Sequence, residues 1–228
     1  MRAKKDGASV KKGEVILEIT GNARDILGYE RTLLNILQRM CGIATATFNV
    51  KKLVKGRCSI AATRKTLLHL IDKKAVSIGK GLTHRLDLSD FILIKDNHLA
   101  VLGNNIRMAI ELSDRNSKTK HIEIEVKNKK EALEAARAIK KIKSKKLFAI
   151  MFDNMEPSMI KTTIIKINNI LKNKNNDKKN KRIILFEASG GINPKNIAEY
   201  SKTGVDVVSL GFLTHSVKAF DMSLDIKA

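Results

Sequence analysis

Charged and small polar residues flank or follow six short apolar runs of this sequence. Arg64 and Lys65 come after SIAAT, His84, Arg85 and Lys95 flank FILI, Glu123 and Glu125 lie in IEIEV, Asp153 and Asn154 follow AIMF, Ser189, Gly190 and Gly191 follow ILFEA, and Gly211 follows VVSL. One such residue would be typical of a cap or a loop. Six runs with the same ending are hard to attribute to accident, so we interpret these residues as parts of one site.

Five of these side chains carry or accept positive charge. They are Arg64, Lys65, His84, Arg85 and Lys95. Packed together without a ligand they would repel one another, whereas an anion with more than one carboxylate would be bound by them, with forked contacts from the arginines. The group therefore predicts a small polyanionic substrate.

The remaining polar residues suit a phosphorylated sugar. Glu125 and Asp153 offer carboxylate oxygens to ribose hydroxyls or to Mg²⁺, a cation that prefers oxygen ligands and phosphate company. Ser189, Gly190 and Gly191 precede a helix expected to open at Pro194, so backbone N–H groups and a helix N-terminus are predicted to face a phosphate. Taken alone, the Gly-Gly pair is equally typical of an ordinary tight turn.

Alternating short and long elements must position these residues. We expect strands at 59–63, 91–94, 121–126, 146–152, 183–186 and 206–210, and helices at 67–78, 99–112, 129–142, 157–171 and 194–201. Strands that alternate with helices at this period predict a parallel sheet, and six of them favour closure into a barrel whose active site lies at the carboxyl ends of the strands. The fold class predicted is α/β.

The first part of the chain follows another pattern. Residues 13–19 alternate in polarity as a half-buried strand does, and apolar residues recur at helical spacing over 29–54, which predicts one or two amphipathic helices. We therefore expect an N-terminal region at 1–57 and a catalytic barrel domain at 58–228. Residues 172–182 (KNKNNDKKNKR) are polar and charged, and are interpreted as a solvated loop.

The formal net charge of +21 permits three kinds of partner: nucleic acid, an anionic membrane or small polyanions. Nucleic acid is disfavoured because the 2 Tyr and 7 Phe are not interleaved with basic stretches as a base-stacking surface requires. No run reaches the roughly 20 apolar residues of a membrane span, and the first residues lack the apolar core of a signal peptide. A cytoplasmic location is expected, with Cys41 and Cys58 as reduced thiols.

Seven segments of the chain resemble the quinolinate phosphoribosyltransferases, the decarboxylating nicotinate-nucleotide pyrophosphorylases. They are ERTLLNILQRMCGIATAT, TRKT, THRLDLSDFILIKDNHL, IEIEV, IMFDNM, FEASGGI and TGVDVVSLGFLTHS, and they span Glu30 to Ser216 in the order of the family. TRKT alone is a weak signal. THR followed by LIKDNH at this spacing is a strong one.

The resemblance implies an incomplete α/β barrel of the phosphoribosyltransferase II type, a partial N-terminal open sandwich and a homodimer or higher oligomer with shared sites. It implies that quinolinate carboxylates meet Arg64, His84, Arg85 and Lys95, that Lys65 lies between quinolinate and pyrophosphate, and that Arg31 reaches into the partner subunit's site. Glu125 and Asp153 resemble the ribose and magnesium carboxylates, and Ser189, Gly190 and Gly211 resemble the cradle of the 5′-phosphate.

Three features depart from the family pattern. Lys80 interrupts a glycine run at 79–81, where the backbone is expected to approach closely. Leu67, Leu68 and His69 follow TRKT in place of a small or Pro-Gly turn, and His69 is interpreted as a structural histidine. The family's first helix and strands before the position of Asp6 are expected to be missing, either naturally or because the start is placed too far downstream.

Other functions stay open from the sequence. A relative associated with molybdenum transport shares the ERT and TRK segments, although KDNH favours the quinolinate branch. Nicotinate phosphoribosyltransferase would bind a single carboxylate, which fits the surplus of cations less well. Two alternatives belong to a different functional class: a basic nucleic-acid-binding protein and an inactive remnant that acts as a scaffold. Turnover of quinolinate without turnover of nicotinate separates these alternatives.

Overall fold

Six parallel strands form the central sheet of the computed structural model, which describes residues 1–172 and 184–227. They are β3 (Ser59–Ala62), β4 (Ile92–Ile94), β5 (His121–Val126), β6 (Leu147–Asp153), β7 (Ile184–Ser189) and β8 (Val207–Leu210), in the spatial order β3-β8-β7-β6-β5-β4. The predicted α/β class with a parallel six-stranded sheet is confirmed. Most of the predicted loop at 172–182 lies outside the described residues.

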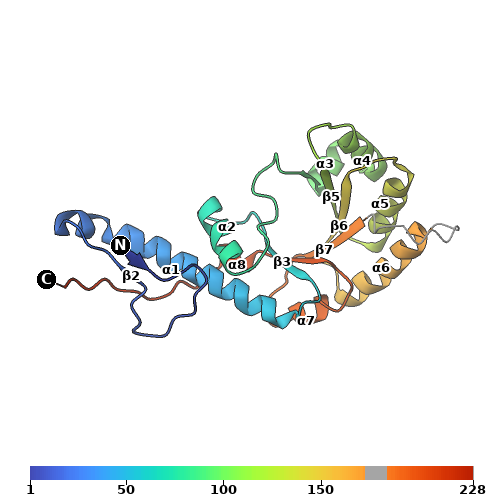
Figure 1. Ribbon diagram of the computed structural model, residues 1–228. Helices are drawn as coiled ribbons and strands as arrows, with labels where there is room; N and C mark the ends of the chain where they lie inside the picture. Colours follow the sequence, from blue (N-terminus) through green and yellow to red (C-terminus); the bar gives the residue numbers. More distant parts are fainter. Residues whose placement is uncertain (173–183, 228) are drawn as a thin grey trace.

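The sheet curves into an open barrel with helices on its convex side (Figure 1). These helices are α2 (His69–Ile78), α3 (Asp96–Val101), α4 (Ile106–Asp114), α5 (Lys129–Lys141), α6 (Pro157–Leu171), α7 (Ile197–Tyr200) and α8 (Phe212–His215). Among the described residues β3 and β4, at the two ends of the strand order, do not pair with each other. Leu82 lies along the free edge of β3, where its N–H donates to the Ile60 carbonyl at 2.7 Å.

Successive side chains of a strand point to opposite sides, and β5 shows how this separates an apolar face from a polar one. In β5, Ile122, Ile124 and Val126 are buried in the main core with residues of α5 and α6. Glu123 and Glu125, between them, point into the barrel, where they contact His84 and Lys95 respectively. The apolar face therefore fixes the register, and the register places the polar residues inside.

The N-terminal part consists of one long helix and a small hairpin. α1 (Ala23–Leu53) starts where the Asn22 side chain accepts a hydrogen bond from the Arg24 N–H, and β1 (Arg2–Ala3) pairs antiparallel with β2 (Leu17–Glu18). The carboxyl-terminal half of α1 packs against α2 and α8, and its other half projects away from the sheet beside the hairpin and the C-terminal tail (Figure 1). The domain limits 1–57 and 58–228 stay a prediction.

The C-terminal tail lies against α1. The Phe220 N–H donates to the Gln38 carbonyl at 3.1 Å, and the Gln38 side chain donates to the Met222 carbonyl at 3.0 Å. Gly42 permits this approach, since a Cβ there would lie 2.3 Å from the Lys218 carbonyl oxygen.

Three predicted elements were wrong in extent. The helix expected at 99–112 is split into α3 and α4, because Gly103 and Asn104 adopt φ of 62° and 59° and Asn105 caps α4. The helix expected at 194–201 is regular only over α7. The strand expected at 13–19 is reduced to β2, since it has a partner only in the two residues of β1. No helix among the described residues is long and apolar enough to cross a membrane.

Candidate active site

The carboxyl ends of the strands meet at one rim, as expected of parallel strands. The pairing of Val126 with Phe152 and of Asp153 with Ser189 places the ends of β5, β6 and β7 side by side. The rim carries Arg64 and Lys65 after β3, Lys95 after β4, Glu125, Asp153, Ser189, Gly190 and Gly211. The structure thus gathers nearly all of the predicted residues at the end of the barrel where such enzymes bind substrates.

Acidic and basic side chains form ion pairs at the β4 and β5 part of the rim. Lys95 Nζ lies 3.1 Å from the Glu125 carboxylate, and Lys127 Nζ lies 2.8 Å from the Asp96 carboxylate. Asp96 is the main cause of the raised pKa of Lys127, and Glu125 and Asp153 contribute less. All three carboxylates therefore lie near the Lys127 ammonium group. The Lys95 side chain is 46% exposed and is available to a ligand.

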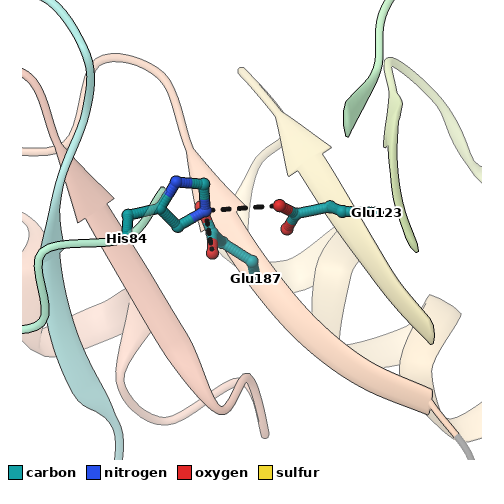
Figure 2. A group of neighbouring side chains, drawn as sticks. All are labelled: His84, Glu123 and Glu187. Atoms are coloured by element: carbon teal, nitrogen blue, oxygen red, sulfur yellow. Dashed lines mark ion pairs between the residues drawn. The ribbon is translucent and has the colours of Figure 1, made fainter. Parts of the chain in front are cut away.

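His84 lies inside the barrel between two buried carboxylates (Figure 2). Its Nε2 is 3.2 Å from Glu123 Oε2 and 3.1 Å from Glu187 Oε2, and Ser209 Oγ donates to Glu187 Oε1 at 2.5 Å. Burial opposes the imidazolium charge, but the two carboxylates outweigh it and raise the pKa of His84 to about 9. Burial and the neighbouring Glu187 raise the pKa of Glu123 to about 7.

Arg85 is also buried, against Phe91. Its guanidinium carbon lies 5.9 Å from the centre of the Phe91 ring, whose edge and face contact His84 and His121. Burial lowers the pKa of Arg85, and the neighbouring charge of Arg64 lowers it further. Two neighbouring arginines that repel each other are what the sequence predicted for an anion site.

The turn that carries Arg64 and Lys65 is held by buried polar residues that sequence reasoning missed. Asp72, fully buried in α2, accepts a hydrogen bond from Thr66 and is bound by Arg39 of α1. Lys73, the next residue, donates to the carbonyls of Ala62 and Thr83, which ties the end of β3 to the residue before His84. Burial lowers the pKa of Lys73 to about 8. Their helical spacing placed both in α2, but nothing in it marked them as buried.

A glycine turn follows β7. Gly190 and Gly191 adopt φ of 90° and 62°, and the Asn154 N–H donates to the Ser189 carbonyl at 2.9 Å. α7 has only four residues and starts at Ile197, so the helix N-terminus expected at Pro194 is absent from this described segment. Backbone N–H groups of the turn itself remain as the phosphate contacts that the sequence predicts. Gly211 follows β8, the strand next to β7, and is the N-cap of α8.

Arg31 is the predicted residue that the fold does not bring to the rim. It lies in the amino-terminal third of α1, its side chain is 72% exposed, and its Nη2 is 4.0 Å from the Glu30 carboxylate. Such an exposed pair contributes little to stability. Within one subunit Arg31 is therefore separate from the other site cations.

The departures at Lys80 and His69 lie outside the site. Lys80 has φ of 67° and is exposed, beside Cys58 and Ser59 at the amino end of β3. The close approach occurs at its neighbours: a Cβ on Gly79 would lie 2.4 Å from the Ala44 carbonyl oxygen. His69 Nε2 lies 2.6 Å from the Leu86 carbonyl oxygen, a structural contact between α2 and the loop after Arg85.

Comparisons with known proteins show which family the chain resembles. The family model of the quinolinate phosphoribosyl transferase C-terminal domain matches residues 43–225, and that of the N-terminal domain matches residues 1–41. The chain belongs to this family. The two matches meet inside α1.

Individual relatives agree. The chain is 40% identical, over 100% of its length and 78% of the relative, to a probable nicotinate-nucleotide pyrophosphorylase [carboxylating] of Methanothermobacter thermautotrophicus. It is 46% identical, over 92% of its length and 71% of the relative, to the corresponding protein of Methanocaldococcus jannaschii. Among solved structures, the nicotinate-nucleotide pyrophosphorylase of Francisella tularensis matches with a TM-score of 0.79 and 32% identity, covering 96% of this chain and 72% of that one.

Proposed function

We infer that this chain is a quinolinate phosphoribosyltransferase. It transfers the phosphoribosyl group of phosphoribosyl pyrophosphate to quinolinate and releases pyrophosphate and CO2, which gives nicotinate mononucleotide for NAD biosynthesis. The observation that carries this assignment is the gathering of Arg64, Lys65 and Lys95 at one rim, with the buried Arg85 close to Arg64 and acids on the adjacent strands, in a chain of this family.

The residues divide the substrates between them. We assign the quinolinate carboxylates to Arg64, His84, Arg85 and Lys95, because these cations come from the ends of β3 and β4 and from the loop before β4. Lys65, in the same turn as Arg64, is placed between quinolinate and pyrophosphate. Ser189, Gly190 and Gly211 hold the 5′-phosphate through backbone N–H groups, and Glu125 and Asp153 hold the ribose.

The reaction needs no nucleophile from the protein. The pyridine nitrogen attacks C1′ of the ribose, the C1′–O bond to pyrophosphate breaks, and the ring becomes cationic. The cationic ring then accepts the electron pair of the C–C bond as the adjacent carboxylate leaves as CO2, and a proton adds at that carbon. Alignment of the substrates and charge stabilisation by the lysines and arginines supply most of the rate enhancement.

We propose Mg²⁺ as the cofactor, held by Glu125 and Asp153. Both are oxygen ligands at the ends of adjacent strands, and Asp153 is half-buried and open to the rim, which fits a cation that keeps several water and phosphate ligands. When bound, Mg²⁺ would neutralise charge on the departing pyrophosphate. Lys65 and Lys95 add fixed positive charge from the protein.

We also propose a homodimer or higher homo-oligomer in the cytosol. Support for a shared site comes from Arg31, which is exposed on a projecting helix, and support for the cytosol comes from Cys41 and Cys58, which are free thiols. Burial raises the pKa of Cys58 to about 11, so it is a poor nucleophile.

Purified chain with phosphoribosyl pyrophosphate and Mg²⁺ tests the assignment. Nicotinate mononucleotide and CO2 are expected to form from quinolinate and not from nicotinate, because the cationic rim is built for a dicarboxylate. Equal turnover of nicotinate would replace this assignment with the monocarboxylate reaction. Retention of nucleic acid without turnover of either acid would favour a binding protein.

Lys95→Ala is expected to lower kcat/KM for quinolinate strongly, whereas Lys161→Ala, which removes an exposed lysine of α6, changes it less than about twofold. Loss of a charged contact to a ligand costs about 2 to 5 kcal/mol. Since Lys95 is half exposed, we expect the lower end, a decrease of about 30-fold. Steady-state kinetics of both variants measures this. Equal activity of the two would remove Lys95 from the site.

Gly190→Ala is expected to raise KM for phosphoribosyl pyrophosphate by about tenfold, because a Cβ would lie 2.4 Å from Asn154 Oδ1 and displace the phosphate turn. Gly56→Ala is the matched control: Gly56 has φ of 73° with open space around it at the other end of β3. Both variants carry similar backbone strain, about 1 to 2 kcal/mol. An equal rise of KM in the control would assign the effect to strain alone.

A further inference from the structure

Glu123, Glu187 and Ser209 form a buried polar group beneath the rim that the assigned roles do not use. Glu123 lies in β5, Glu187 in β7 and Ser209 in β8, and all three are buried on the concave side of the sheet. Buried carboxylates are costly unless they are paired. The neighbour that both carboxylates share is His84.

Both carboxylates form ion pairs with the same atom of His84, Nε2. The Nε2 edge of the ring faces Glu123 and Glu187, and Figure 2 shows the second ring nitrogen, Nδ1, on the side of the ring away from Glu123. Ser209 holds the other oxygen of Glu187. No partner for Nδ1 occurs among the described residues, so that nitrogen is free to meet a ligand.

The backbone at His84 needs this support. His84 has φ of 51°, a left-handed conformation that is uncommon for a residue with a Cβ. The Thr83 carbonyl just before it is held by Lys73, and the Phe91 ring packs edge-on with the imidazole at a centroid distance of 5.3 Å. The backbone and the ring are thus fixed separately.

We propose that Glu123 and Glu187 are positioning residues. Their ion pairs with Nε2 orient the His84 ring so that Nδ1–H points toward a quinolinate carboxylate. This role deepens the proposed function and rests on it. The two acids act through His84 and do not touch the substrate. The same contacts that orient the ring raise its pKa to about 9, so that the Nδ1 proton is present at neutral pH.

The surroundings favour an ion pair over a metal ion. The three side chains offer ligand atoms within 4.8 Å of one another, a spacing that a metal ion would accept. However, Arg85 and Lys73 already place positive charge beside Glu123 and Glu187. A divalent ion there would add to that charge and displace His84 from its direct contact with both acids.

Glu187→Gln and Glu123→Gln test the proposal, with Glu134→Gln in α5 as the matched control. Each of the first two is expected to raise the Kd for quinolinate by about tenfold, and to change KM for phosphoribosyl pyrophosphate and the melting temperature little. Calorimetric titration gives the Kd without turnover. The control is expected to match the wild type.

The decisive measurement repeats Glu187→Gln in a His84→Ala background. A residue that acts only through His84 has no further effect once the imidazole is gone, so the Kd is expected to change less than about twofold. Additive losses would mean that Glu187 meets the substrate itself, and an unchanged Kd in the single variants would also overturn the proposal. A lower melting temperature, together with equal weakening of quinolinate and phosphoribosyl pyrophosphate binding, would mean that Glu123 and Glu187 serve folding alone.

Two further measurements distinguish a failure of this positioning role from a failure of the proposed function. If the purified wild type contains one metal ion per chain and the His84→Ala variant contains none, then His84, Glu123 and Glu187 bind a metal ion and the proposed ion pair is wrong. In the ligand-free protein the ¹⁵N resonances of His84 are expected to shift in Glu187→Gln and not in Glu134→Gln. If the wild type neither binds nor converts quinolinate, the proposed function itself fails, and the wild type alone reveals this.

Discussion

A mixed dimer of Arg31→Ala and Lys95→Ala subunits is expected to have far more activity than either homodimer. Arg31 is exposed on the projecting half of α1, away from the rim of its own barrel, whereas Lys95 belongs to that rim. In a two-fold dimer each contact is used twice, so Arg31 of each subunit would complete the partner's site. One pocket of the mixed dimer then carries both lesions and the other carries none.

Two affinity tags on co-expressed subunits would isolate the heterodimer, and about half of the wild-type turnover per dimer is expected because one of two symmetric pockets is intact. A mixture of Arg64→Ala with Lys95→Ala is the control. Both residues belong to the same barrel, so each pocket keeps one lesion and the mixture stays inactive. If the Arg31 heterodimer is as inactive as its parents, Arg31 acts within its own subunit or not at all.

Arg39→Met is expected to lower the free energy of unfolding by about 3 to 5 kcal/mol, because it leaves a buried carboxylate without its cation. The Arg39 guanidinium donates to both oxygens of Asp72 at 2.7 Å and to the Thr214 carbonyl at 2.8 Å. This contact joins α1, α2 and α8 under the turn that carries Arg64 and Lys65. For a chain of this size the loss corresponds to roughly 6 to 20 °C in melting temperature.

Arg107→Met is the surface control. Arg107 pairs with Glu111 one helical turn away on the exposed face of α4, and its loss is expected to cost less than about 0.5 kcal/mol. Adding Asp72→Asn to Arg39→Met is expected to restore part of the stability, since the unpaired charge is then gone. Urea unfolding followed by circular dichroism measures all four proteins. A small loss for Arg39→Met alone would show that water or another donor replaces the guanidinium.

The Arg39 effect is also expected to depend on pH. Burial alone would raise the pKa of Asp72, but hydrogen bonds from Arg39, Thr66 and the Leu68 N–H outweigh it and hold the pKa below its ordinary value. The contribution of the carboxylate is therefore complete above the unfolded pKa, about 3.9, and is lost as pH falls through the lower folded pKa. The difference between wild type and Arg39→Met is expected to shrink in that acidic range.

Local pattern was enough to predict the sheet and the residues of the rim. Helical and strand periods differ, so the runs that became β3 to β8 were recognisable, and parallel strands place their carboxyl ends together whatever lies between them. That rule alone brought Arg64, Lys95, Glu125, Asp153 and Ser189 to one edge before any contact was known. The motif spacing then gave the family, which the comparisons confirm.

Tertiary structure decided which charges meet. Nothing local to THR, IEIEV or FEAS shows that His84 lies between Glu123 and Glu187, because those contacts cross from strand to strand inside the barrel. Nothing in the local sequence marks Asp72 and Lys73 as buried, yet both are buried where α2 packs on β3 and α1. The break between α3 and α4 likewise depends on left-handed backbone at Gly103 and Asn104.

Sequence by itself therefore determined the edge of the sheet at which the candidate site residues gather, because strand direction and side-chain alternation are local properties. The pairing of the buried charges and the separation of Arg31 from its own rim were decided only when distant segments packed together. Coulombic contacts and burial depend on distances through space, and in this chain those distances connect segments far apart in sequence.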